Sequence, residues 1–468
     1  MSSAAESFGI AAAGAVVASL TLLLLSACQS GSSRPAAAIV VTSEERQRID
    51  GWGSALTSDR EPLIGESDTT ATLRKRLSSL ILDRLGENVV RVFVGDFGPG
   101  AAPPPADGTA GAMTRRARFI RAARARGVRI MLTGANAPAA WKSGNRLRDG
   151  MEVAYGDYLA AWAKRLQAVG ARGDYLAIGN EISNPDFFNM SETQAALVYH
   201  ELARRIRGDH LRLRLATGDN ESFSDASRYS ALELRDPLVA RYAGVVAAHA
   251  YDKWGSSGRA AQHDLARLAR GRGLRVWMTE HLAAAPPPGE CGKPGPVDDT
   301  IHSALALADD ITTLMNGPAE PNAYLTLRAV ARDHGAGIAA IVLTPPTADC
   351  ARPRPATGFR LTKRFYAELQ YTRAAPRGSV RLVLRQRLPQ GMKAIAFQAP
   401  GGSRRVVVVN ESNRGRRVLL DFGGRSGRLS ARRTSARESY APLTLGSYRG
   451  KPKVVLARAE SITTFFLR

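Results

Sequence analysis

The chain has 468 residues, 44% of them hydrophobic, so it is globular rather than disordered and long enough for one large domain and one small one. Its formal net charge is +23, but the basic residues are scattered, and nine of the 65 are Lys while the rest are Arg. Aromatic residues make up 6% and no nucleic-acid-binding motif is present, which argues against a nucleic-acid-binding protein. An acidic polysaccharide or an anionic cell surface would respond to the same charge.

The N-terminal residues 1–28 contain an apolar stretch that ends in Leu-Ser-Ala-Cys. This segment resembles a bacterial lipoprotein signal peptide, in which small residues precede a cysteine that receives lipid. The resemblance implies an exported protein anchored through Cys28 to a membrane of the bacterial envelope, in the periplasm or at the cell surface. The first ten residues contain no Lys or Arg, so a plain transmembrane anchor is the alternative. Residues 29–38 then form a flexible tether.

Short apolar runs alternate with amphipathic helical patterns between residues 39 and 372. Continuous apolar character is typical of parallel strands that are covered on both faces. Eight such repeats over about 320 residues predict a (β/α)8 TIM barrel with insertions. One helical pattern, residues 191–207, opens with Ser191-x-x-Gln194, a capping-box signature. The predicted strands are residues 51–56, 88–95, 129–136, 174–181, 213–218, 244–251, 275–280 and 337–344.

The pattern changes after residue 372, where short strands are separated by Gly, Pro, Asn and Ser. Residues 373–468 therefore form a separate antiparallel β-sandwich domain. Residues 37–49 are also strand-like and could pair with that domain, which would make it discontinuous. The expected fold class is α/β: a TIM barrel with a C-terminal antiparallel β-sandwich.

Two predicted barrel strands end in a carboxylate. The fourth ends in Asn180-Glu181 and the seventh in Glu280. Active sites of TIM barrels lie at the C-terminal ends of the strands, so the two glutamates should face each other across the barrel axis. Paired carboxyl groups about 5 Å apart are the geometry of a retaining glycosidase, in which one is the acid/base and the other the nucleophile. Glu181 and Glu280 are therefore the predicted catalytic pair.

Over roughly residues 40–468 the chain resembles glycoside hydrolase family 30 of clan A. The similar segments are "RIDGWGSAL", "YGDYLAAWAKRLQAVGARGDYLAIGNE", "AAHAY", "VWMTEH" and "KRFYAELQYTRAAPRGSVRL". The resemblance implies a retaining O-glycoside hydrolase that acts on β-linked oligo- or polysaccharides. Position by position it implies that Glu181 is the acid/base and Glu280 the nucleophile. Asn180 would bind the sugar 2-hydroxyl, and Arg91 and Tyr251 would hydrogen-bond the nucleophile and keep it ionised.

Other residues near the strand ends are candidates for substrate binding. Trp141 and Trp254 follow the third and sixth strands, where sugar faces could stack on them. His249 is either a substrate contact or a core histidine, and Arg91 could instead pair with Asp96. Ile182 stands where the family usually has Pro, so the resemblance does not determine the loop on the side of the site that binds the leaving group.

The cysteines suggest one disulfide. With Cys28 lipidated, Cys291 and Cys350 remain, and they lie in the loops after predicted strands seven and eight, at one face of the barrel. Export permits a bridge between them, with two free thiols as the alternative. Metal-ligand cysteine pairs are absent from the sequence, and no metal or cofactor is expected.

The sequence also leaves two other classes of function open. One is a catalytically silent carbohydrate-binding surface lipoprotein on the same barrel, and the other is a nucleic-acid or envelope-binding protein that uses the positive charge. The sugar, the linkage, and endo or exo action are not indicated, because loops determine specificity.

Overall fold

The structure, a computed structural model, describes residues 37–56, 63–64, 69–95, 111–253, 255–283, 290, 292–293, 295–333, 336–349 and 354–468. Several predictions fall outside the described residues: the signal peptide, the tether up to residue 36, Asp96, Trp254 and the three cysteines, Cys28, Cys291 and Cys350.

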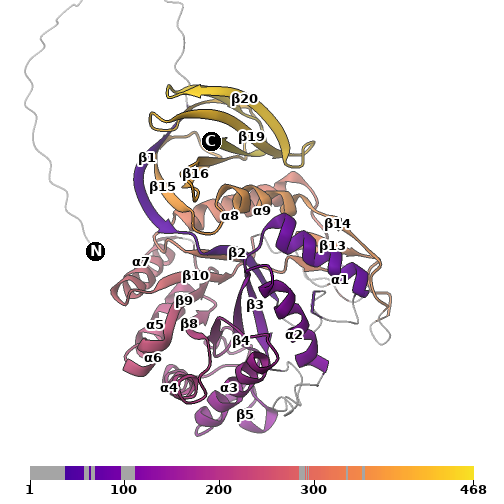
Figure 1. Cartoon of the computed structure of the whole chain (residues 1–468), viewed down its shortest axis with the longest axis vertical. Coiled ribbons are helices and arrows are strands. Elements are labelled where there is room, and N and C mark those ends of the chain that lie inside the picture. Colours follow the sequence, from indigo (N-terminus) through magenta and orange to yellow (C-terminus); the bar gives the residue numbers. More distant parts are fainter. Residues whose placement is uncertain are drawn as a thin grey trace, which may run out of the picture. The chain divides into compact units, whose positions relative to one another are not determined.

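The larger domain is a closed barrel of eight parallel strands (Figure 1). Its interior is filled by small and bulky apolar side chains such as Val89, Ala216 and Trp277. The glycines of "GWG" in the first strand permit close pairing, since a β-carbon at Gly53 would lie 1.6 Å from the Val89 carbonyl oxygen. The barrel strands are β2 (Gly51–Leu56), β3 (Val89–Val94), β4 (Arg129–Gly134), β7 (Tyr175–Ala177), β8 (Arg214–Asn220), β9 (Ala243–His249), β10 (Arg275–Glu280) and β11 (Ala323–Leu327).

The prediction of the eighth barrel strand was wrong. The barrel closes through β11, which pairs with β10 and β2. The predicted run 337–344 supplies instead η3 (Ala336–Ile338) and β13 (Ile341–Thr344), and β13 pairs with β12 (Val330–Ala331) and β14 (Gly358–Leu361) outside the barrel. Both β11 and β13 are short buried apolar runs, so only their pairing partners tell them apart.

Helices surround the barrel, and among the described residues none is long and apolar enough to cross a membrane (Figure 1). The predicted capping box is present. The backbone amide of Gln194 donates to Ser191 Oγ, and the backbone amide of Ser191 donates to Gln194 Oε1. The helices are α1 (Ala71–Ser78), continued by the π-helical η1 (Ser79–Leu85), α2 (Gly111–Arg124), η2 (Ala139–Trp141), α3 (Glu152–Ala168), α4 (Glu192–Gly208), α5 (Phe223–Glu233), α6 (Pro237–Tyr242), α7 (Gly255–Gly271), α8 (Ile301–Asn316) and α9 (Lys363–Ala374). A small hairpin after η2 joins β5 (Lys142–Ser143) to β6 (Arg146–Leu147).

The smaller domain is a mostly antiparallel β-sandwich, whose strands follow the order β20-β19-β22-β17-β16-β15-β1-β18-β21. The N-terminal strand β1 lies between β15 and β18, antiparallel to the first and parallel to the second. Ile39 and Val41 of β1 are buried in the same core as Leu382 and Phe465. The strands are β1 (Ala37–Arg48), β15 (Val380–Arg387), β16 (Met392–Gln398), β17 (Arg404–Asn410), β18 (Arg416–Asp421), β19 (Ser426–Ser435), β20 (Ala441–Arg449), β21 (Lys453–Ala457) and β22 (Ser461–Leu467).

Helices α8 and α9 lie between the barrel and the side domain (Figure 1). One hydrophobic cluster joins Trp52 of the barrel, Tyr371 of α9 and Phe397 of β16. The Trp52 indole donates to the Ala375 carbonyl at 2.6 Å, which fixes the first barrel strand against the end of α9. The side domain therefore braces the barrel through a shared core.

Candidate active site

The C-terminal ends of the barrel strands bring the two predicted glutamates together. Glu181 follows β7, Glu280 ends β10 and His249 ends β9, and all three are buried. One carboxylate oxygen of each glutamate and one ring nitrogen of His249 lie within 4.8 Å of one another. The two glutamates therefore approach across the barrel mouth closely enough to act on a single bond.

Arg91, on β3, is the hub of this site. Its side chain is fully buried, and its Nη1 donates to Glu280 Oε2 at 2.8 Å. Nη2 donates to Asp219 at 2.8 Å and to Asn180 Oδ1 at 2.7 Å, while Nε donates to Thr133 Oγ1 at 3.1 Å. The alternative pairing with Asp96 cannot be compared, because Asp96 lies outside the described residues. One guanidinium thus fixes the position of the Glu280 carboxylate and of the Asn180 amide.

Asp219, at the end of β8, is a site residue that the sequence prediction missed. It is fully buried and also accepts from Thr279 Oγ1 at 2.6 Å. Burial alone raises the pKa of this carboxyl, but the Arg91 guanidinium and the His249 ring outweigh burial and hold the pKa well below its usual range. The Asp219 carboxylate therefore stays negatively charged beside Arg91 and His249.

His249 lies between two carboxylates. Its Nδ1 is 2.7 Å from Glu181 Oε1, and its Nε2 is 3.6 Å from Asp219 Oδ1, which is an ionic contact beyond hydrogen-bond distance. Burial lowers the pKa of this imidazole, but Glu280, Asp219 and Glu181 outweigh burial and raise the pKa to about 9. The histidine is therefore protonated at neutral pH and donates to Glu181. A contact of His249 with substrate stays a prediction.

Tyr251 completes the surroundings of Glu280. Its hydroxyl donates to Glu280 Oε1 at 3.0 Å, so both oxygens of this carboxylate accept a hydrogen bond, the other from Arg91. Burial, and then the charges of Glu280 and Glu181, raise the pKa of the Tyr251 phenol, which keeps it protonated as a donor. Two donors, one on each oxygen, hold this carboxylate in a fixed orientation.

Two residues of the site adopt left-handed backbone conformations that L-amino acids rarely occupy. Glu181 has φ 52° and Asp219 has φ 57°. The Glu181 amide donates to the Asp219 carbonyl at 2.9 Å, which links the ends of β7 and β8. Such conformations cost about 1–3 kcal/mol each and are concentrated at functional sites. Both left-handed positions therefore lie where the ends of β7 and β8 meet.

A second buried charge cluster supports Tyr251 from behind. Lys253 Nζ lies 2.6 Å and His281 Nε2 lies 2.9 Å from the carboxylate of Asp310, and Lys253 also contacts His281. The His281 ring centroid is 5.7 Å from that of Tyr251. Sequence reasoning did not assign this cluster, although His281 directly follows Glu280.

Trp141 does not join the charged cluster through any contact of the described residues. It lies in η2 after β4, half-buried, with its ring edge-on to Tyr158 at a centroid separation of 6.0 Å. A role for Trp141 in sugar stacking stays a prediction.

Ile182, where a loop different from that of the family was expected, is fully buried. The loop folds back so that the Met190 backbone amide donates to the Ile182 carbonyl at 3.0 Å.

Glu181, His249 and Glu280 together have the donor atoms of a metal site. Hydrogen bonds already engage both oxygens of Glu280, from Arg91 and Tyr251, and join His249 Nδ1 to Glu181 Oε1, whereas His249 Nε2 has no hydrogen-bond partner among the described residues. A divalent ion would also have to lie close to the buried Arg91 guanidinium. The residues present fit two charged catalytic carboxylates better than a metal ion.

No family model and no curated protein matches this chain. Solved structures do match it, across 92% of its length. The catalytic domain of a glycoside hydrolase family 30 xylanase from Talaromyces cellulolyticus is 20% identical and covered completely, with a TM-score of 0.70. A family 30 endoxylanase from Clostridium papyrosolvens is 18% identical, also covered completely, with a TM-score of 0.67. An endo-β1,6-glucanase is 12% identical and 93% covered, with a TM-score of 0.66.

Proposed function

The chain has the fold of the family 30 xylanase structures, and we propose that it is a retaining O-glycoside hydrolase that acts on β-linked oligo- or polysaccharides. The observation that carries this proposal is the approach of Glu181 and Glu280 oxygens to within 4.8 Å. Retaining enzymes hold their two carboxyl groups about 5–5.5 Å apart, whereas inverting enzymes leave about 6.5–9.5 Å for a water molecule.

Glu280 is the proposed nucleophile. Its carboxylate attacks the anomeric carbon and forms a glycosyl ester as the bond to the leaving oxygen breaks. Arg91 and Tyr251, one on each oxygen, hold the carboxylate oriented before the attack. The Arg91 contact to Asn180 leaves the amide nitrogen of Asn180 free to donate to a sugar hydroxyl next to the reacting carbon.

Glu181 is the proposed acid/base, and His249 supplies its proton. The imidazolium and the Glu181 carboxylate share one proton across the 2.7 Å contact. Glu181 passes that proton to the leaving oxygen, and His249 becomes neutral. In the second step Glu181 takes a proton from the attacking water, the ester breaks, and the shared proton is restored.

The test is a hydrolysis screen on aryl β-glycosides and on xylan and glucan oligosaccharides, with the anomeric form of the first product followed by NMR. The proposal expects a product that retains the β configuration. A product of inverted configuration would overturn the mechanism. No hydrolysis of any substrate would leave the silent carbohydrate-binding protein as the better account.

The location of the protein is a separate proposal that rests on residues 1–28 alone. We propose that the chain is exported and anchored in the envelope through lipid on Cys28. Labelling of cells with a radioactive fatty acid should mark the wild-type protein and leave the Cys28→Ser variant unmarked. Equal labelling of both proteins would contradict it.

A further inference from the structure

The barrel has a cavity of about 700 Å³ at the end opposite the two glutamates. Its lining comes from the turns that precede β7 and β8 and from the ends of α2 and α3. A neighbouring cavity of about 290 Å³ shares Arg124 with it and includes the first residues of β4, β7 and β8. We call the two together the basal groove. The first cavity is lined by Arg124, Lys164, Gln167, Ala168, Gly170, Arg172, Asp209, His210 and Arg212.

The basal groove has an excess of positive charge. Seven Arg and Lys side chains and two carboxylates line it, an excess of five. Both carboxylates are already paired within the protein: Asp174 accepts from Arg124 at 2.8 Å, and Asp209 binds Lys164 at 2.9 Å. Of the other guanidinium groups, that of Arg129 lies 3.2 Å from Asp50, whereas those of Arg212, Arg214 and Arg377 form no ion pair with the described residues.

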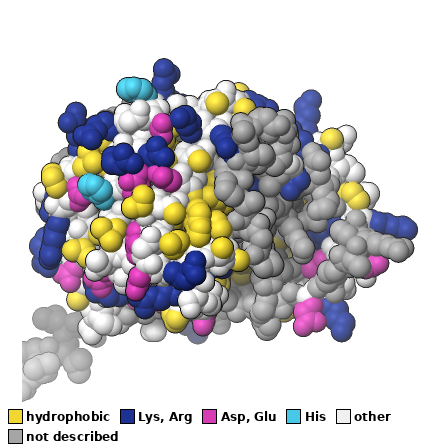
Figure 2. All heavy atoms as spheres, turned by 90° about the horizontal axis from the view of Figure 1, so that it is seen from below, with side chains coloured by type: hydrophobic (Ala, Val, Ile, Leu, Met, Phe, Trp, Pro, Cys, Tyr) yellow, Lys and Arg dark blue, Asp and Glu magenta, His cyan; other side chains and the backbone are white. Residues whose placement is uncertain are grey.

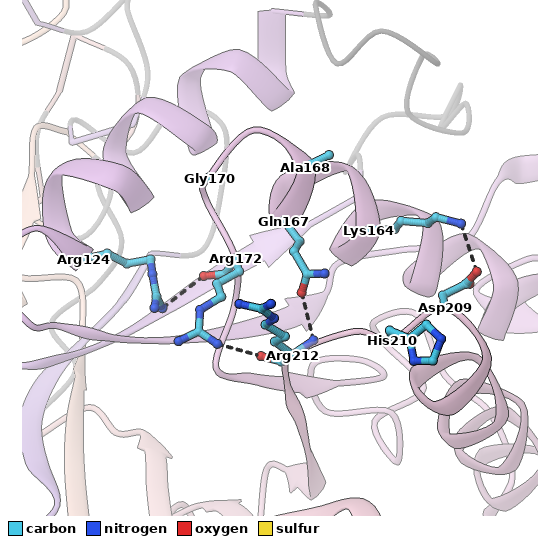
Figure 3. A pocket seen from close by; sticks show the side chains of 9 residues that line it. All are labelled: Arg124, Lys164, Gln167, Ala168, Gly170, Arg172, Asp209, His210 and Arg212. Atoms are coloured by element: carbon cyan, nitrogen blue, oxygen red, sulfur yellow. Dashed lines mark hydrogen bonds and ion pairs between the residues drawn. The ribbon is translucent and has the colours of Figure 1, made fainter.

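Three arginines of the groove are available to a ligand. Arg172 donates to the Arg212 carbonyl at 3.3 Å and otherwise lies 3.9 Å from Asp174. The side chains of Arg212 and Arg214 are exposed and form no ion pair with the described residues. Figure 3 shows Arg172 and Arg212 side by side, with Lys164 and His210 on the other side of the pocket.

Some exposed arginines elsewhere pair with nearby acids, as Arg228 does with Asp225 at 2.6 Å and Arg360 does with Asp299 at 3.1 Å. Others, such as Arg417 and Arg428, form no ion pair with the described residues. On the face in Figure 2, basic side chains are spread out with acidic ones among them. The basal groove is distinguished because Arg172, Arg212 and Arg214 line two adjoining cavities.

We propose that the basal groove binds a segment of an acidic polysaccharide, separately from the catalytic cleft. A guanidinium recognises a carboxylate or sulfate group through two parallel hydrogen bonds, and a cleft lined by one sign of charge concentrates the field. The larger cavity falls within the usual size of small-ligand sites. Tyr175 is the one aromatic residue among the groove residues and is only half exposed, so the groove lacks the stacking surface that single-stranded nucleic acids use.

A second site of this kind would hold the protein on an anionic polymer and raise the local concentration of glycan near the barrel mouth. This inference rests on the proposed function only because the bound polymer would supply the glycan that is hydrolysed. Binding at the basal groove itself requires no hydrolysis.

The experiment measures binding of a galacturonic acid hexasaccharide to the full chain by calorimetry, with a neutral xylose hexasaccharide as the ligand control. The groove variant is Arg172→Gln/Arg212→Gln/Arg214→Gln. The matched control variant, Arg417→Gln/Arg428→Gln/Arg437→Gln, removes three exposed arginines of the side domain. We expect at least a tenfold loss of affinity in the groove variant, less than a twofold loss in the control, and weaker binding by the wild type at high salt.

Equal losses in both variants, or none in either, would overturn the proposal. So would tighter binding of single-stranded DNA of equal charge, or of anionic lipid vesicles, through the same three arginines. Turnover of an aryl glycoside should be unchanged in both variants, and Glu280→Gln should bind the acidic hexasaccharide like wild type. A failure of the groove is thereby distinguished from a failure of the proposed reaction.

Discussion

His249 Nδ1 lies 2.7 Å from Glu181 Oε1, in a site where the pKa of the histidine is raised to about 9. The raised pKa means that the shared proton is present below about pH 9 and is lost as the pH rises through that value. Activity that depends on this proton should therefore fall on the alkaline side. This contact connects the acid/base directly to the pH dependence of the reaction.

The variant His249→Gln should shift the alkaline limb of the kcat/KM profile to lower pH by more than one unit, because it removes the imidazole whose pKa is raised to about 9. Turnover of substrates with poor leaving groups should fall about 10²-fold. The control is His200→Gln, an exposed histidine that contacts Asp236, and it should leave the profile unchanged. An unshifted profile in His249→Gln would show that the imidazole does not supply the proton.

The variant Asp219→Asn should distinguish a role of Asp219 in positioning the groups of the site from a role in folding. The amide keeps the shape of the side chain but removes a charge that raises the pKa of His249, so the alkaline limb should move to lower pH. A tenfold or larger loss of kcat should accompany it, since Arg91 also loses a partner. If Asp219 had only a structural role, the variant would have a lower melting temperature and an unchanged alkaline limb of the pH profile. Asp209→Asn, at the opposite end of the barrel, serves as control.

Glu280→Gln should reduce turnover by several orders of magnitude while the protein stays folded, because the amide cannot form the glycosyl ester. The amide oxygen can still accept from Arg91, and the amide NH2 can donate to the Tyr251 hydroxyl oxygen, so the fold should be retained. Circular dichroism and the melting curve verify folding, and a burst-phase assay measures the chemical step. Wild-type activity in this variant would end the assignment of the nucleophile.

Glu181→Ala should affect substrates unequally. A good leaving group needs no proton, so aryl glycosides of acidic phenols should retain much more activity than unactivated oligosaccharides. Azide should accelerate the variant by entering the space left by the carboxylate and attacking the glycosyl ester. Equal losses on both kinds of substrate, with no response to azide, would exclude Glu181 as the acid/base.

A disulfide between Cys291 and Cys350 stays a prediction, and the neighbouring described residues support it. A β-carbon at Gly292 would lie 3.1 Å from the Thr347 carbonyl oxygen, so the two loops run side by side. The bridge would close a loop of about 60 residues and stabilise the fold by about 4 kcal/mol in the chain-entropy model. Thiol titration of the unreduced, denatured protein should find neither thiol free, and two free thiols would refute the bridge.

The barrel and the glutamate pair could be predicted because each depends on a local pattern, an apolar strand that ends in a polar residue. Asp219 was missed because the fifth strand was ended at Gly218, and a buried carboxylate has meaning only once Arg91 is known to face it. The left-handed conformation of Asp219 also leaves no mark in the sequence.

The eighth strand shows a different limit of sequence reasoning. Residues 341–344 and 323–327 have the same short apolar character, and the choice between them depends on which one lies beside β2 after the barrel has closed. The same closure determines the separation of the glutamates. Distances between residues far apart in the chain come from topology rather than from local pattern.

The position of β1 inside the side domain has a consequence for the order in which the chain folds. Thr42 of β1 donates to the Val383 carbonyl at 2.8 Å, across 341 residues of sequence. At about 5–20 residues per second, a ribosome needs on the order of 20–70 s to deliver the partner strand. During that time β1 has no neighbour in its sheet, and the sandwich can close only after the barrel has been synthesised. Strand β1 is thus among the last to find its place, and its open edges must be kept from other chains until then.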